Sequence, residues 1–143
     1  MATISRFEDL EIWQLARKIC KKLHVILEAK KEFKDYGLKT QIFNSSGSCM
    51  DNIAEGFERN GRKEFKQFLS IAKGSAGEVR SQLYRLHDSN ALTQLEFDEL
   101  YSDTISMSKK ISSFIDYLKK SELKGTKFCE PEVEYQVLEN LEH

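Results

Sequence analysis

Residues 62–87, which read RKEFKQFLSIAKGSAGEVRSQLYRLH, decide the fold class. Their apolar side chains recur at intervals of three and four residues, the spacing that places side chains on one face of an α-helix. The members of this stripe are Phe65, Phe68, Leu69, Ala72, Ala76, Val79, Leu83 and Leu86. The stretch therefore predicts a long amphipathic helix that buries one side.

Three other stretches have the same periodicity. We expect helices over residues 7–31, 38–59 and about 93–120, separated by short breaks. The residues expected to face inward are Leu10, Trp13, Ala16, Cys20, Leu23, Leu27, Leu38, Ile42, Cys49, Ile53, Phe57, Leu100, Ile105, Ile111, Ile115 and Leu118. Four rods of similar length with short connections predict an all-α, antiparallel, up-down-up-down four-helix bundle.

Local signals mark the ends of these helices. Ser5 and Glu8 have the spacing of a capping box before the first helix, and Thr93 and Glu96 have it before the fourth. Asn60-Gly61 is a turn signal between the second and third. We expect residues 1–122 to form the bundle, 123–140 an acidic C-terminal tail, and 141–143 to be the remnant of a purification tag.

Small residues cluster in the two central helices, at Ser45–Ser48 and at Gly74–Gly77. Gly47 lies about as far before the Asn60-Gly61 turn as Gly74 lies after it, so a hairpin places the two clusters opposite each other. Two interpretations stay open. The clusters allow close helix packing, or they line a small cavity for a ligand.

Composition and motifs exclude several classes of protein. No apolar run approaches the roughly 20 residues of a membrane span, and no signal-like block follows the N-terminus. The three cysteines form no metal or disulfide pattern, so we expect reduced thiols in the cytoplasm. Phosphate-binding loops, the HExxH motif and the di-iron ExxH motif are all missing from the sequence. We therefore expect no catalytic centre, no metal and no cofactor.

The charge is unevenly distributed along the chain. Residues 1–127 contain all 22 Lys and Arg against 18 Asp and Glu, whereas residues 128–143 contain five Glu and no Lys or Arg. One basic group recurs every seven residues and is widened at its start, and a second lies in the first helix. The two groups are Arg59, Arg62, Lys63, Lys66, Lys73 and Arg80, and Arg17, Lys18, Lys21 and Lys22.

These basic residues permit two interpretations. A surface that joins both groups would bind the phosphates of a nucleic acid in a salt-dependent way. The alternative is a solvated charged face that Glu64 and Glu78 balance. The segment from Asn52 to Phe57 is equally open. Glu55 and Gly56 form a helix-end ion pair and a close packing point, or they contact another subunit together with Asn52.

These residues belong to a wider pattern. It consists of the segment from Phe7 to Trp13, Tyr36-Gly37-Leu38, Gln41, Asn52 to Gly56, Lys63-Glu64-Phe65, Phe68-Leu69, Ala72 to Ser75, and Glu78. With this pattern the chain resembles the bacterial four-helix-bundle family encoded in 23S ribosomal RNA intervening sequences. The resemblance covers about residues 7–120. The chain departs from the family at residues 31–35, where a proline and acidic residues are usual, and in its acidic tail.

The resemblance implies a four-helix bundle without catalysis. It also implies a homo-oligomer, since related proteins form rings of five subunits, and association with RNA or DNA, as in the similar accessory protein of diversity-generating retroelements. The residues of a subunit contact, or else of the family motif alone, are Tyr36, Gly37, Leu38, Asn52, Glu55 and Gly56. The first hypothesis is an oligomeric bundle that binds nucleic acid or a partner that handles it. The alternatives are a protein–protein adaptor or ring protein without nucleic-acid binding, and a small-molecule binder.

Overall fold

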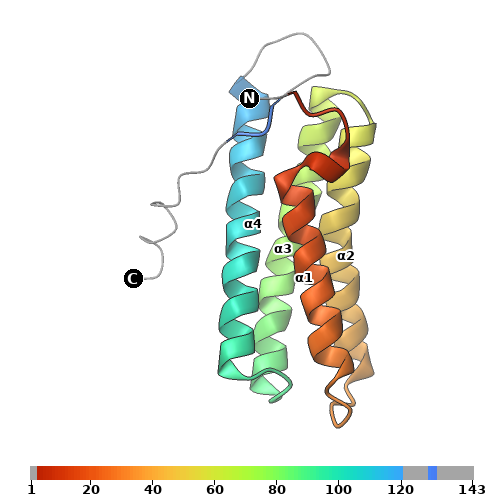
Figure 1. Cartoon of the computed structure of the whole chain (residues 1–143), viewed down its shortest axis with the longest axis vertical. Helices are drawn as coiled ribbons and strands as arrows, with labels where there is room; N and C mark the ends of the chain where they lie inside the picture. Colours follow the sequence, from red (N-terminus) through yellow and green to blue (C-terminus); the bar gives the residue numbers. More distant parts are fainter. Residues whose placement is uncertain (1–2, 121–128, 132–143) are drawn as a thin grey trace.

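Four long helices and one short 3-10 helix form the described part of the chain. The computed structural model describes residues 3–120 and 129–131. In chain order the elements are η1 (Phe7–Asp9), α1 (Glu11–Glu28), α2 (Tyr36–Glu58), α3 (Arg62–Asp88) and α4 (Gln94–Lys120). The helices lie lengthwise against one another and alternate in direction (Figure 1). The predicted all-α, antiparallel four-helix bundle is confirmed.

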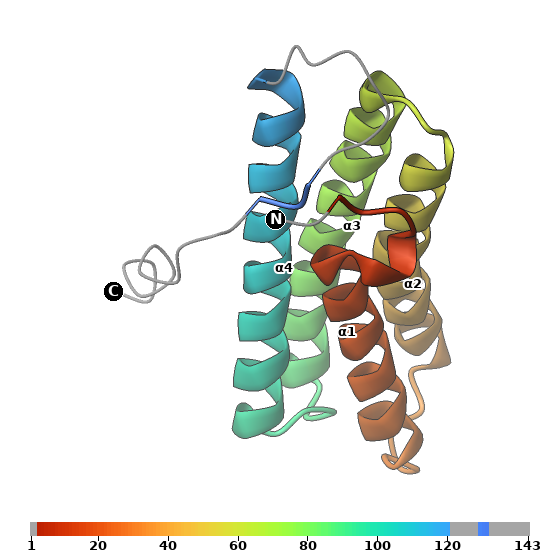
Figure 2. The same cartoon turned by 45° about the horizontal axis from the view of Figure 1, so that its top comes forward.

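The order of the helices around the bundle determines which surfaces adjoin. α1 packs against α2 and α4, and α3 also packs against α2 and α4. α1 and α3 therefore occupy opposite corners, with α4 between them on one side of the molecule (Figure 2). Outward side chains of α1 and α3 consequently lie on different faces.

The core follows the predicted stripes most closely in α2 and α3. Leu38, Ile42, Cys49 and Ile53 of α2 are almost completely buried. The α3 stripe is buried from Phe65 to Leu86, apart from Phe68, which is half-buried like Phe57 of α2. Two aromatic rings, Phe65 and Phe114, stack at the centre of one end with centroids 5.2 Å apart.

The predicted inward faces of α1 and α4 are partly wrong. In α1, Trp13 and Cys20 are only half-buried, and Ile12 and Ile19 occupy the core instead. Ile12, Ala16, Ile19, Leu23 and Leu27 form the buried α1 stripe, one position before the predicted Trp13 and Cys20. In α4, Ile105 is half-buried, while Met107 and Phe114 are buried.

The start of the first helix also differs from the prediction. No side chain caps η1, and the α-helix begins only at Glu11, so the capping box of Ser5 and Glu8 is wrong. The carboxylate of Glu130 accepts hydrogen bonds from the backbone N–H groups of Glu11, at 2.5 Å, and Ile12, at 3.0 Å. An acidic side chain is favourable there because a helix N-terminus has unpaired N–H groups and positive polarity. A residue beyond α4 thus caps α1.

Caps and turns position the other helices. The Asp35 carboxylate accepts a hydrogen bond from the N–H of Leu38, so α2 begins at Tyr36, two residues before its predicted start. The capping box of Thr93 and Glu96 is confirmed, since each side chain accepts from the backbone N–H of the other residue. Asn60 has a φ of 60°, the left-handed conformation that closes the α2–α3 turn.

The small-residue clusters meet at serines, because the glycines point elsewhere. Ser48 Oγ and Ser75 Oγ lie 2.9 Å apart between α2 and α3. The predicted placement of the two clusters opposite each other is confirmed at these serines. A Cβ atom added at Gly47 or Gly74 would meet nothing within 4 Å, so neither glycine marks a close approach of the helices. The close approach occurs at Gly56, where a Cβ would lie 2.6 Å from Cβ of Phe68.

Candidate nucleic-acid interface

The predicted basic residues divide into two groups on either side of α4. In the α1 group, Lys22 contacts Glu99 and Asp103 of α4. In the α3 group, Lys73 Nζ donates to Ser112 Oγ of α4 at 3.3 Å. Because α1 and α3 occupy opposite corners, the two groups do not form the single surface that the sequence suggested.

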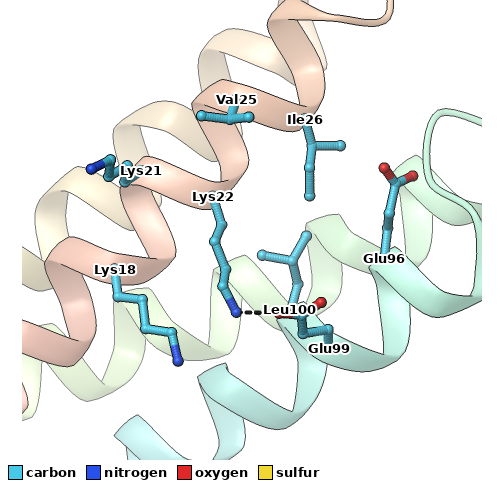
Figure 3. Close-up of a pocket in the computed structure, with 8 residues that line it drawn as sticks. All are labelled: Lys18, Lys21, Lys22, Val25, Ile26, Glu96, Glu99 and Leu100. Atoms are coloured by element: carbon cyan, nitrogen blue, oxygen red, sulfur yellow. Dashed lines mark hydrogen bonds and ion pairs between the residues drawn. The ribbon is translucent and has the colours of Figure 1, made fainter.

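Carboxylates of α4 neutralise much of the α1 group. Lys22 Nζ pairs with Glu99 (Figure 3). It also lies 2.8 Å from Asp103 Oδ2, and Lys18 lies 4.0 Å from Asp103. Burial alone would lower the pKa of Lys22, but its hydrogen bonds to Asp103 and Glu99 raise it overall. Arg17 lies over the ring of Trp13, 5.8 Å from its centroid. Of the four predicted cations, Lys21 alone has neither an ion pair nor a ring contact in the described structure.

A pocket of about 280 Å³ opens in the groove between α1 and α4. Val25, Ile26 and Leu100 supply its apolar surface, with lysines of α1 along one edge and Glu96 and Glu99 along the other (Figure 3). This pocket lies between α1 and α4 and not at the α2–α3 hairpin, where one of the two sequence interpretations placed a ligand cavity. The charges at its edges are mostly paired across the groove, Lys22 with Glu99 and Glu96 with Lys30.

The groove carboxylates predict a loss of stability in acid. The hydrogen bond from Lys22 lowers the pKa of Glu99 below 4.5. Burial would raise the pKa of Glu96, but the hydrogen bond from Lys30 helps to lower it overall. A carboxyl with a lower pKa in the folded chain adds stability above its unfolded pKa and loses this contribution as the pH falls through its folded pKa. We expect the urea concentration at the unfolding midpoint to decrease as the pH is lowered below about 4.5.

A pair of single substitutions isolates this effect. In Lys22→Gln the unfolding midpoint should depend less steeply on pH below 4.5, because the pKa of Glu99 returns toward its ordinary value. Lys21→Gln, one residue away and exposed, should keep the wild-type dependence. An equal dependence of the unfolding midpoint on pH in wild type and Lys22→Gln would contradict the assignment of the acid effect to the pairing of Lys22 with Glu99.

The α3 group includes three cations that are aligned along the helix. Lys66, Lys73 and Arg80 recur every seven residues, so they lie along one side of the helix, the side next to α4. None of the three has an ion pair among the described residues. The predicted balancing residues, Glu64 and Glu78, each precede a stripe cation by two positions, which places them about 200° away around the helix.

Arg59 and Arg62, at the start of the α3 group, contact nearby side chains. Arg59 pairs with Glu55 at 2.9 Å and lies over the ring of Phe68, and Arg62 lies over the ring of Tyr117. Lys63 is exposed and has no ion pair within the described structure. We therefore define the α3–α4 face by the three aligned cations, Lys66, Lys73 and Arg80, together with Ser112.

An exposed aromatic residue, which the sequence interpretation missed, lies at one end of this face. Tyr84 follows Arg80 by one helical turn and is 50% exposed. His87, the next residue in the seven-residue series after Arg80, contacts Phe97 of α4 at 4.9 Å. The sequence contained a signal for His87, since the seven-residue series from Arg59 to Arg80 continues to this residue.

The residues of the expected subunit contact lie at different depths and positions. Leu38 and Gly56 are buried within the bundle, and Asn52 donates to the carbonyl and hydroxyl of Ser48. Tyr36 and Gly37 are exposed at the first turn of α2, about 24 Å along the helix from Asn52. The arrangement therefore favours helix packing for Gly56 and an ion pair for Glu55 over the interpretation in which these residues contact another subunit.

The thiols have the properties of structural residues. None of Cys20, Cys49 and Cys129 forms a disulfide bond within the described structure. Burial raises the pKa of the Cys49 thiol to about 12 and also raises that of Cys20. A thiol with such a pKa is protonated at neutral pH and is therefore a poor nucleophile or metal ligand. Within the described residues, no group of three or more His, Cys, Asp and Glu could hold a metal ion.

Comparison with known proteins identifies the family. The sequence profile of the 23S rRNA-intervening sequence protein family matches residues 8–113. The chain belongs to this family. A protein of unknown function from the S23 ribosomal protein family of Bacteroides thetaiotaomicron VPI-5482 has a similar fold, with a TM-score of 0.65 and 20% sequence identity. The similarity covers 73% of this chain and 97% of that one. A search of curated proteins gives no match.

Family membership agrees with the resemblance inferred from the sequence. The matched residues include all of α1, α2 and α3 and most of η1 and α4, so the family region is the bundle itself. The acidic tail predicted at residues 123–140 lies beyond this region, and most of it is outside the described residues. None of the four described helices combines the length and the apolar character that crossing a bilayer requires.

Proposed function

We propose that this member of the 23S rRNA-intervening sequence protein family is a non-enzymatic bundle that binds nucleic acid through the α3–α4 face. The supporting observation is the alignment of Lys66, Lys73 and Arg80, which have no ion pair in the described structure. From Lys66 to Arg80 the helix rises about 21 Å, enough for contacts with several phosphates.

The contrast between the two basic groups supports this choice of surface. A cation that already pairs with a carboxylate gives up that partner when it binds a phosphate, so its net contribution to binding is small. Lys18 and Lys22 are in this position. The three cations of the α3–α4 face have no carboxylate partner in the described structure, and Lys73 has only the neutral hydroxyl of Ser112 as a side-chain partner, so the release of counterions favours binding.

Charge removal on this face should weaken binding. Fluorescence anisotropy with a 20-nucleotide single-stranded RNA of mixed sequence would measure Kd over a range of salt concentrations. For Lys66→Gln/Lys73→Gln/Arg80→Gln we expect Kd to rise at least tenfold at low salt. Loss of three phosphate contacts should also make the slope of log K against log salt shallower by about 2, at roughly 0.7 per contact.

A matched variant controls for net charge. Arg17→Gln/Lys18→Gln/Lys21→Gln removes an equal number of positive charges from α1 and leaves Lys22 in its ion pairs. We expect this variant to retain most of the affinity and most of the salt slope. Equal losses in both variants would reject the α3–α4 face, and a wild type that fails to bind even at low salt would reject nucleic-acid binding altogether.

The other functions considered from the sequence have less support. The adaptor function depended on the acidic tail at residues 123–140, of which the structure describes only residues 129–131. Assembly of several copies into a ring, and a cytoplasmic location, stay predictions from the family resemblance and from the composition.

A further inference from the structure

Four aromatic side chains gather where α3 ends and α4 begins. Tyr84 and His87 belong to α3, and Phe97 and Tyr101 belong to α4. The rings of Phe97 and Tyr101 stack with centroids 5.5 Å apart and planes 22° apart. Phe97 is almost buried, so this pair forms a fixed base for the cluster.

Tyr84 has a different position in the cluster. Its ring meets Phe97 at 58° and Tyr101 at 72°, with centroid distances of 5.1 and 5.7 Å. Neither neighbour lies parallel to the Tyr84 ring, and half of the residue is exposed. Tyr84 is therefore held by its neighbours while it keeps ring surface open for a further planar group.

The exposed ring adjoins the last cation of the α3–α4 face. Arg80 and Tyr84 are four residues apart on one helix, so their side chains are neighbours, roughly 5–6 Å apart at Cβ. The hydrogen bond with Tyr101 raises the pKa of Tyr84, and the nearby charge of Arg80 acts in the opposite direction. A cation and an exposed aromatic ring thus lie side by side.

We propose that the α3–α4 face takes single-stranded nucleic acid, with phosphates along Lys66, Lys73 and Arg80 and an unpaired base stacked on the exposed ring of Tyr84. This inference rests on the proposed function. In a duplex each base is already stacked and paired, so only an unpaired base can reach the ring. Stacking on an aromatic side chain is tolerant of base identity, and little sequence preference is expected.

The test compares two Tyr84 variants on three probes. The probes are a 20-nucleotide single-stranded RNA, its 20-base-pair duplex, and a strand of the same length without bases. Tyr84→Ala should raise Kd for the single strand about tenfold and leave Kd for the duplex unchanged. Its salt slope should remain that of the wild type, because the phosphate contacts are intact. Tyr84→Phe, which keeps the ring, should bind the single strand like the wild type.

The strand without bases supplies an independent measurement. Wild-type protein should bind it about as weakly as Tyr84→Ala binds the normal strand, and the substitution should add no further loss. Tyr36→Ala controls for removal of an exposed tyrosine, since Tyr36 is 63% exposed and lies on α2. Circular dichroism establishes that each variant is folded.

The outcomes separate this inference from the proposed function. If the triple cation variant loses affinity but Tyr84→Ala does not, binding through the α3–α4 face stands and the stacking site is rejected. Equal losses on single strand and duplex would also reject it, as would a Tyr84→Phe variant as weak as Tyr84→Ala. If no probe binds the wild type, both proposals fail.

Discussion

Replacement of Phe114 by alanine is expected to lower the free energy of unfolding by about 3–5 kcal/mol. Phe114 is completely buried in α4, and its ring stacks on Phe65 of α3 and meets Tyr117 edge-on. Removal of the ring loses its burial and leaves a cavity that the rigid ends of two helices close only partly. Urea unfolding followed by circular dichroism at 222 nm measures the change.

The control for Phe114→Ala is an apolar side chain outside the core. Ile71 of α3 is 51% exposed, and Ile71→Ala should change the free energy of unfolding by no more than about 0.5 kcal/mol. If Phe114→Ala does not fold, Phe114→Leu gives a milder and measurable loss. A loss below about 1 kcal/mol for Phe114→Ala would mean that the α3–α4 aromatic contact is not part of the core in solution.

The second large effect is expected at Gly56, where α2 approaches α3 most closely. An added Cβ would lie 2.6 Å from Cβ of Phe68 and 3.6 Å from Cα of Phe65, so the two helices must separate. Alanine is intrinsically better than glycine in a helix by about 1 kcal/mol, but such overpacking costs about 1–3 kcal/mol. We expect Gly56→Ala to be destabilising by up to about 2 kcal/mol after these opposing contributions.

Gly47 provides a matched control within the same helix. A Cβ added there meets nothing within 4 Å, so Gly47→Ala should gain the helix preference of alanine without a clash. The melting temperature should therefore rise in Gly47→Ala and fall in Gly56→Ala, by a few degrees in each case. A rise in both variants would show that α2 and α3 are farther apart at Gly56 than the structure indicates.

The fold was predictable because each helix carries its own periodic signal. The apolar stripe from Phe65 to Leu86 predicts α3 independently of the other helices. The capping box of Thr93 and Glu96, which spans four residues, marks the start of α4. The exact inward face of α1 was less accessible. Ile12 and Trp13 are adjacent and both apolar, so the periodicity permits either stripe, and packing against the other helices selects Ile12.

The candidate interface was predictable in its residues and not in its geometry. Spacing alone placed Lys66, Lys73 and Arg80 along one side of a helix. Their separation from the α1 cations depends on the order of helices around the bundle, which no local pattern encodes. The same holds for the ion pair of Lys22 with Asp103, whose partners are 81 residues apart.

The cap on α1 has a consequence for how the protein is made. Glu130 is 119 residues beyond Glu11 in the chain and emerges from the ribosome after all four helices. Until then the first N–H groups of α1 lack this carboxylate, while the hairpin of α2 and α3 can already form from neighbouring segments. Biosynthesis thus fixes a temporal order in which the earliest helix translated is among the last to receive its full set of contacts.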